Sequence, residues 1–156
     1  MRPDGPKIPP HLMPLESRRL TGAQVRSIRG DLWCTPGEIQ QGSRRHTITW
    51  GPSAMQMARR LCLTTWTWGR WESQDPPSRY WCALIRHYVK TGEAPRVKDY
   101  PWSRLLRLQA RVGWAQLREN MGSSKSQWTK WRRAGAIPAK HGAGAWLWLI
   151  DGLLHA

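Results

Sequence analysis

The sequence predicts an all-α fold, built as two small helical bundles that are joined by a short linker. Three observations predict it. Apolar residues recur at spacings of three and four along most of the chain. Hydroxyl residues that commonly cap helices stand before several of these stretches. A 16-residue pattern also occurs twice, 60 positions apart, so the chain is expected to contain two copies of one helical unit.

The repeat pairs residues 57–72 with residues 117–132 without a gap. The two copies share an apolar pair, a capping hydroxyl and two tryptophans, at Met57/Leu117, Leu61/Met121, Thr64/Ser124, Trp68/Trp128 and Trp71/Trp131. Each copy has the pattern of a helix, a turn and a second helix, so the fold class is two helix-turn-helix bundles. The tryptophans at positions i and i+3 are expected to pack on the preceding helix.

The first half divides into an arm and a bundle. Residues 1–20 are expected to be a flexible arm, because five prolines in the first 14 positions exclude a helix. Residues 21–92 form the first predicted domain. Its opening helix is capped by Thr21, with Val25, Ile28, Leu32 and Trp33 expected on one face.

A small loop or hairpin insertion is expected within this first domain, over residues 34–51. Residues 47–50 alternate like a short strand, and Arg44, Arg45 and His46 would form the tip. Further helices are predicted after Ser53, Thr64 and Ser78, and the helix after Ser78 ends at Gly92. That last helix is expected to place one apolar face inward, consisting of Trp81, Leu84, Ile85, Tyr88 and Val89.

Residues 93–101 contain two prolines and several charges and are predicted to be the linker. The second domain, residues 102–156, starts with a helix whose apolar residues are Trp102, Leu105, Leu106 and Leu108. A helix around residues 115–121, a turn at Gly122 and a helix from Ser124 to Arg133 follow. The C-terminal helix, residues 143–154, is apolar on nearly all sides. It must be buried in its own domain or in a homodimer.

Charge indicates the class of partner. The chain has 25 Lys and Arg against 10 Asp and Glu, a formal net charge of +15, which attracts polyanions. A nucleic acid or an anionic membrane is the natural partner of such a charge, and the repeated helix-turn-helix pattern favours double-stranded DNA. A membrane is not expected, because the N-terminus lacks the apolar run of a signal peptide and residues 143–154 are too few to span a bilayer. A cytosolic location follows as an expectation.

Chemistry at a catalytic or metal site is not indicated. The three cysteines are widely spaced and form no Cys-x-x-Cys, so neither a zinc site nor disulfides are expected. The histidines form no ligand pair, and no glycine-rich phosphate loop follows a strand. The sequence therefore predicts no enzyme, no cofactor and no metal.

Two segments resemble a known family. Residues 64–72, TTWTWGRWE, resemble the recognition-helix pattern Ser-x-x-x-Val-x-x-Trp-Glu of helix-turn-helix regulators of the Cro and lambda-repressor class. Residues 131–138, WRRAGAIP, are similar to Cro-like phage regulators, in which a helix ending Trp-x-x-x-Gly-x-Ile-Pro follows the turn. Each copy departs from the family once. Cys62 occupies the turn position where glycine is usual, and Arg118 replaces a small residue, usually alanine, that Ala58 keeps in the first copy.

The resemblance and the helical spacing together imply a set of DNA-binding residues. Arg70 or Lys130 is expected to bind guanine, Gln127 could bind adenine if it faces outward, and the paired arginines are expected to bind phosphate. The set is Arg59, Arg60, Thr64, Thr65, Trp66, Gly69 and Arg70 in the first copy, and Ser124, Lys125, Ser126, Gln127, Thr129, Lys130, Arg132 and Arg133 in the second.

These residues lead to three hypotheses. The first is a sequence-specific DNA-binding transcriptional regulator, a repressor of the phage or plasmid type, in which one chain reads two half-sites or a homodimer forms through residues 143–154. The alternative is a small basic inhibitor or adaptor, of the anti-restriction or anti-CRISPR kind, that binds a nucleic-acid-processing complex. The third is single-strand or RNA binding by stacking on tryptophan.

Overall fold

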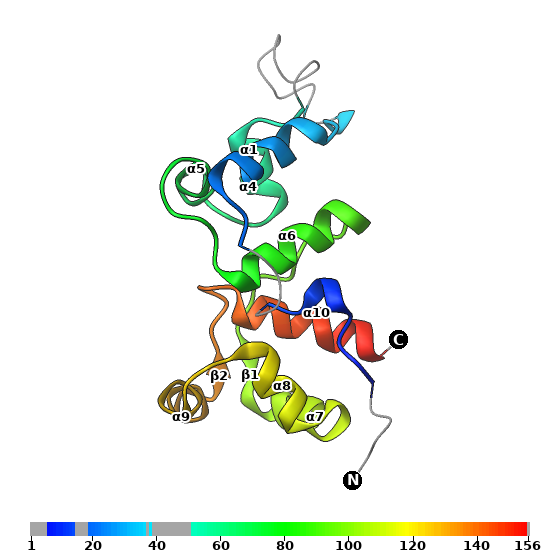
Figure 1. The fold of residues 1–156 in the computed structure, drawn as a ribbon, viewed down its shortest axis with the longest axis vertical. Coiled ribbons are helices and arrows are strands. Elements are labelled where there is room, and N and C mark those ends of the chain that lie inside the picture. Colours follow the sequence, from blue (N-terminus) through cyan, green and yellow to red (C-terminus); the bar gives the residue numbers. More distant parts are fainter. Residues whose placement is uncertain (1–5, 15–18, 37, 39–50, 156) are drawn as a thin grey trace. The chain divides into compact units, whose positions relative to one another are not determined.

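The structure is a computed structural model that describes residues 6–14, 19–36, 38 and 51–155. Its architecture is all-α, as the sequence predicts, and two short strands form the one sheet of the described residues. The chain divides into two compact units (Figure 1). One unit is residues 19–77, and the other combines residues 1–18 with residues 78–156. We refer to them as the middle unit and the composite unit.

The middle unit contains α1 (Gly22–Asp31), α4 (Ala54–Arg60) and α5 (Thr65–Ser73). The three caps expected from the sequence are present. Thr21 and Ser53 each form a capping box with the glutamine three residues later, and the Thr64 side chain accepts a hydrogen bond from the Thr67 amide. Helix α5 packs on both α1 and α4. The core between them consists of Leu20, Val25, Met57, Ala58, Leu61 and Trp68.

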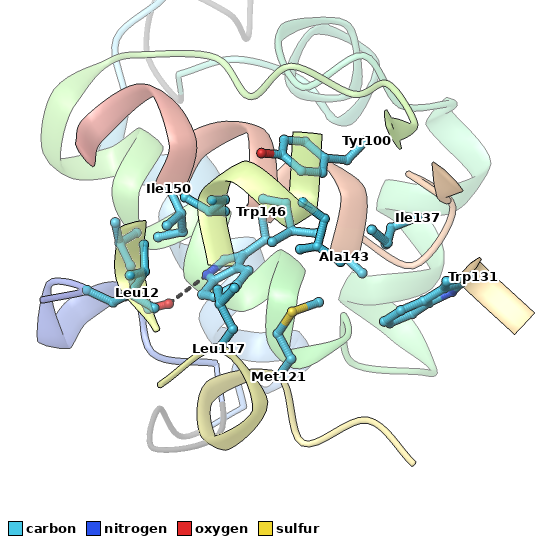
Figure 2. Packing of buried hydrophobic residues seen from close by; sticks show 14 of the residues in the cluster. Leu12, Tyr100, Leu117, Met121, Trp131, Ile137, Ala143, Trp146 and Ile150 are labelled. Carbon is cyan, nitrogen blue, oxygen red and sulfur yellow. Dashed lines mark hydrogen bonds between the residues drawn. The ribbon is translucent and has the colours of Figure 1, made fainter. Parts of the chain in front are cut away.

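The composite unit contains more elements. In chain order they are the 3-10 helix η1 (Pro10–Leu12), α6 (Arg79–Thr91), β1 (Tyr100–Pro101), α7 (Trp102–Val112), α8 (Trp114–Met121), α9 (Lys125–Ala134), β2 (Ala136–Ile137) and α10 (Ala143–His155). Strands β1 and β2 pair antiparallel, with Tyr100 opposite Ile137. Trp146 of α10 is fully buried among side chains from η1, α8 and the strands (Figure 2).

The expected flexible arm is wrong for residues 6–14. Ile8 and Leu12 are buried in the core of the composite unit. The Trp146 Nε1–H group donates to the Leu12 carbonyl at 2.7 Å, and the Ile8 amide donates to Gln116 Oε1 at 2.9 Å. Prolines do exclude an α-helix here, but a 3-10 turn and an extended strand of chain can still dock two apolar side chains. The rest of the predicted arm, residues 1–5 and 15–18, lies outside the described residues.

The domain boundaries also differ from the expected ones. Helix α6, expected in the first domain, packs on η1 and α10 in the composite unit. The segment expected to be the linker, residues 93–101, ends in β1, where Tyr100 is fully buried. Ser78 Oγ donates to the His141 carbonyl at 2.7 Å, which fixes the start of α6 to the C-terminal part of the chain. The division therefore falls after Pro77.

Three expected core residues are exposed, namely Trp33, Val89 and Leu106. Helix α1 ends at Asp31, so the helical period no longer applies at Trp33. In α7, the buried face follows Leu105, Leu108 and Val112, which leaves Leu106 about 100° away from it. The hairpin expected over residues 34–51, with its basic tip at Arg44, Arg45 and His46, falls largely outside the described residues.

The C-terminal helix is buried in its own unit, which was one of the two expectations for it. Trp146, Leu147 and Ile150 of α10 belong to the composite core. Among the described residues, every helix is either too short or too polar to cross a membrane.

Candidate nucleic-acid interface

The two copies of the sequence repeat have the same local structure. Buried, half-buried and exposed positions follow one another identically over residues 61–70 and 121–130. Cys62 and Gly122 both have a left-handed backbone, with φ of 56° and 58°. Thr64 and Ser124 then cap the next helix by accepting from the amides of Thr67 and Gln127. Both copies are thus a helix, a left-handed residue, a cap and a second helix.

Helix α5 packs through Trp68, which is fully buried. Its Nε1–H group donates to Glu72 Oε1 at 2.9 Å, and Glu72 is paired with Arg29 of α1 at 2.8 Å. Trp71 is half-buried and lies edge-on to Trp68, with ring centroids 6.0 Å apart. The expectation that these two indoles pack inward is confirmed for Trp68, and Trp71 occupies the rim.

The outward face of α5 carries Thr65, Trp66 and Arg70, all exposed, with Gly69 between them. Arg70 is the one cation of this helix. Its Nε donates to Asp75 Oδ2 at 2.8 Å, and its guanidinium carbon lies 5.0 Å from the Trp66 ring centroid. Thr64 is also committed, because its hydroxyl caps the helix. The charge that α5 offers to a polyanion is therefore compensated by a neighbouring carboxylate.

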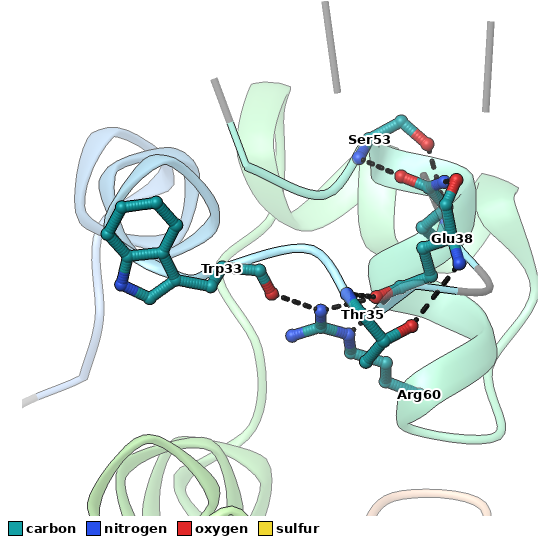
Figure 3. A network of polar contacts seen from close by, with 6 residues as sticks. Trp33, Thr35, Glu38, Ser53 and Arg60 are labelled. Carbon is teal, nitrogen blue, oxygen red and sulfur yellow. Dashed lines mark hydrogen bonds and ion pairs between the residues drawn. The ribbon is translucent and has the colours of Figure 1, made fainter. Parts of the chain in front are cut away.

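Of the two arginines expected to bind phosphate near α4, Arg60 is engaged elsewhere. Its Nε donates to Glu38 Oε2 at 3.0 Å, and it also donates to the Trp33 carbonyl (Figure 3). Burial alone would raise the pKa of Glu38, but the hydrogen bonds from Arg60 and Thr35 outweigh it and hold that pKa below its usual value. Arg60 is thus already paired with a carboxylate, and its expected contact with phosphate stays a prediction. Arg59 is exposed.

Helix α9 packs through Trp128 and Trp131, both buried as expected. Their rings meet edge-on at 5.1 Å, and Trp128 also contacts Trp114 of α8 and Trp102 of α7, at 4.8 and 6.4 Å between centroids. Arg118, which matches the buried Ala58, is exposed. The backbone of α5 lies close to that of α4, whereas α9 does not approach α8 to the same extent. The second helix is therefore held by large indole rings in the second copy, and by close helix packing in the first.

The outward face of α9 is strongly basic. Helical spacing places six residues on one arc of this helix. We call them the α9 basic face: Lys125, Ser126, Thr129, Lys130, Arg132 and Arg133. None of its four cations forms an ion pair within the described part of the chain, and no Asp or Glu occurs between residues 120 and 150.

Two hydroxyls of the predicted set on α9 bind the backbone of the helix itself, and Gln127 lies at the edge of the exposed arc. The Ser124 hydroxyl is the N-cap, Gln127 is half-buried at the edge, and the Thr129 hydroxyl donates to the Lys125 carbonyl at 3.0 Å. Tyr80 steadies the preceding turn, because its hydroxyl donates to the Met121 carbonyl at 3.0 Å. Burial raises the pKa of Tyr80 to about 12, so this donor stays protonated.

Matched positions of the two helices differ in charge. Where the α9 basic face has Lys125, Ser126, Thr129, Lys130, Arg132 and Arg133, α5 has Thr65, Trp66, Gly69, Arg70, Glu72 and Ser73. At these positions α9 carries four positive charges. Helix α5 carries one positive charge, at Arg70, and one negative charge, at Glu72, which is mostly buried and paired with Arg29. The aligned sequences contain this difference at Thr65/Lys125, Glu72/Arg132 and Ser73/Arg133, whereas the apolar pattern is the same in both copies.

No group of three His, Cys, Asp or Glu side chains that could hold a metal occurs among the described residues. No protein-family model, no curated protein and no solved structure matches the chain.

Proposed function

We propose that this chain is a sequence-specific double-stranded DNA-binding transcriptional regulator, a repressor of the phage or plasmid type that acts in the cytosol. Helix α9 would enter the major groove. One observation carries the proposal: the exposed arc of α9 combines four cations without an ion pair in the described part of the chain and an inner side anchored by two buried tryptophans. A recognition helix needs a fixed inner face and polar or cationic groups that can reach base edges.

Position along α9 divides the roles. Lys125 and Ser126 lie in the first turn, the part of a recognition helix that contacts base edges, and Lys130 lies on the same face at the middle of the helix. Lys130 can donate to guanine O6 and N7. Arg132 and Arg133 lie in the last turn, where they would bind phosphates and set the orientation of the helix.

A gel-shift titration with duplex DNA from the flanks of the gene, at physiological salt, tests the proposal. Lys130→Gln should weaken binding to the preferred duplex about tenfold or more, because one base contact contributes about 1–3 kcal/mol of discrimination. Arg70→Gln removes the same charge at the matched position of α5 and should leave affinity within about twofold. Binding that ignores sequence, or a larger loss from Arg70→Gln, would refute the proposal.

The oligomeric state decides how two half-sites are read. With α9 as the single reading helix, a homodimer would supply the second copy. The homodimer expected through residues 143–154 stays a prediction, since Trp146, Leu147 and Ile150 already serve the core of their own unit. Light scattering on the purified chain, combined with the length of the DNA footprint, tests it.

The inhibitor or adaptor hypothesis is a second candidate, and two exposed tryptophans of the middle unit favour it. Trp66 is 69% exposed and Trp33 is 87% exposed, and tryptophan is enriched among the residues that dominate protein interfaces. A pull-down tests this candidate. Capture of a protein partner should persist after nuclease treatment, should be lost with Trp66→Ala and should be retained with Lys130→Gln.

A further inference from the structure

The composite unit contains a cavity of about 500 Å³, which lies apart from α9. Its lining comes from α6, the segment that follows α6, α7 and α10. The volume is in the range of sites for small organic ligands. Its apolar part is formed by Leu84, Leu149 and Leu153, with the indole of Trp148 beside them.

Two of the charged lining residues compensate each other. Arg104 Nε donates to Asp151 Oδ2 at 2.7 Å, and the Tyr100 hydroxyl donates to the same oxygen at 2.9 Å. Asp151 is almost completely buried. This pair is part of the wall, and it leaves one positive and one negative side chain of the lining to be explained: Arg96 and Glu93.

Arg96 and Glu93 are placed to face a ligand. The guanidinium carbon of Arg96 lies 3.9 Å from the Trp148 ring centroid. Stacking occupies the face of a guanidinium and leaves its N–H groups, which point outward in the plane, able to bind a carboxylate. Glu93 is mostly exposed, and its Oε2 lies 3.7 Å from His87 Nε2. The two charges are three residues apart on one short segment.

His87 supplies a buried polar atom without a hydrogen bond. Its side chain is 6% exposed. Nδ1 lies 3.3 Å from His11 Nε2, and the two rings are stacked. Nε2 is buried and has no hydrogen-bond partner, although His87 lines the cavity. When Nδ1 donates to His11, Nε2 is left as an acceptor. In that tautomer Nε2 has no donor among the described residues and lies 3.7 Å from the Glu93 carboxylate, so a ligand cation that binds Glu93 would lie close to both acceptors.

We propose that this cavity binds a free α-amino acid with an apolar side chain. The α-carboxylate would bind the Arg96 guanidinium, and the α-ammonium would donate to Glu93. The apolar side chain would lie against Leu84, Leu149 and Leu153. A zwitterion matches both of the remaining charges, whereas a simple acid would face Glu93 and a simple amine would face Arg96.

Isothermal titration calorimetry of the full chain with phenylalanine and two truncated analogues tests this. L-Phenylalanine carries both charges, 3-phenylpropionate lacks the ammonium, and 2-phenylethylamine lacks the carboxylate. We expect phenylalanine to bind, and each analogue to bind about tenfold more weakly or worse, because each leaves one charged group of the cavity unmatched. Equal binding of an analogue, or no binding of phenylalanine at millimolar concentration, would overturn the proposal.

Variants then assign the contacts. Arg96→Gln and Glu93→Gln, both on the surface, should each weaken phenylalanine binding about tenfold. Lys98→Gln changes an exposed cation that does not line the cavity and should leave binding unchanged. In addition, Glu93→Gln should not weaken the binding of 3-phenylpropionate, because that ligand has no ammonium group to contact Glu93. If the Lys98 variant reduces binding as much as the Arg96 variant, general charge attracts the ligand and the assigned site is wrong.

Discussion

Cys62 holds a backbone conformation that a side chain disfavours. It has a φ of 56°, its side chain is exposed, and the matched residue in the second copy is Gly122. We expect Cys62→Gly to raise the free energy of unfolding by up to about 1 kcal/mol, because the Cβ strain disappears and little packing is lost. Urea unfolding followed by circular dichroism measures it.

Two matched variants control this prediction. Cys62→Ala keeps the Cβ and should leave stability close to that of the natural chain, whereas Gly122→Ala should lower it by about 1 kcal/mol. A Cys62→Gly chain less stable than the natural one would show that the cysteine side chain has a packing role that outweighs the backbone strain.

The ion pair between Glu38 and Arg60 makes stability depend on pH. The pKa of Glu38 is lowered in the folded chain: burial acts to raise it, and the hydrogen bonds from Arg60 and Thr35 outweigh burial. A group with a lowered folded pKa contributes stability above its unfolded pKa, and the contribution is lost as the pH falls through the folded value. We therefore expect Glu38→Gln to destabilise the chain at pH 7 by about 1–3 kcal/mol.

The difference in the free energy of unfolding between this variant and the natural chain should shrink as the pH falls below about 4. At such pH the carboxyl of Glu38 becomes protonated and is neutral, as glutamine is. Unfolding titrations at several pH values check this. A difference that stays constant with pH would mean that glutamine loses packing rather than the ion pair.

At the scale of elements, local chemistry determines most helix boundaries. Thr21, Ser53, Thr64, Ser78 and Ser124 each cap a helix where the sequence predicts one, because a cap depends on residues within a single turn. The ion pairs of Arg60 and Arg70 could not be predicted in this way. Arg60 meets Glu38 across 22 positions, so its partner depends on tertiary structure. Asp75 is close to Arg70 in sequence but lies after the end of α5, where helical spacing no longer applies.

A substitution at Gly69 tests whether α5 or α9 is the helix that reads DNA. A Cβ built at Gly69 meets nothing within 4 Å, and the same holds for Gly30 of α1. Alanine at either helical position should raise the free energy of unfolding by about 0.5–1 kcal/mol. If α9 reads DNA, Gly69→Ala should leave DNA affinity unchanged, as Gly30→Ala should. Gel-shift titration checks this, and a loss confined to the Gly69 variant would move the base contacts to α5.

At the scale of the whole molecule, burial links segments that are distant in sequence. Leu12 and Trp146 are 134 positions apart and share a hydrogen bond, and Tyr100 pairs with Ile137 across the small sheet. The composition of residues 1–20 and 93–101 suggests an arm and a linker, because prolines and charges are typical of both. Both segments instead pack into the core of the composite unit through a few apolar side chains, namely Ile8, Leu12 and Tyr100. A short window of sequence cannot show what these side chains pack against.

The salt dependence of DNA binding tests whether the net charge of +15 acts through α9 or through the surface in general. Each phosphate neutralised in the complex contributes about 0.9 to the slope of log K against log salt concentration. The double variant Arg132→Gln/Arg133→Gln should therefore lower that slope by about 2 while the preferred duplex stays the same. The control Lys90→Gln/Lys98→Gln removes two exposed cations of the same unit that lie off α9, and it should leave the slope unchanged. If both double variants lowered the slope equally, DNA would contact the unit without a fixed orientation. That result would contradict a role of α9 as the reading helix.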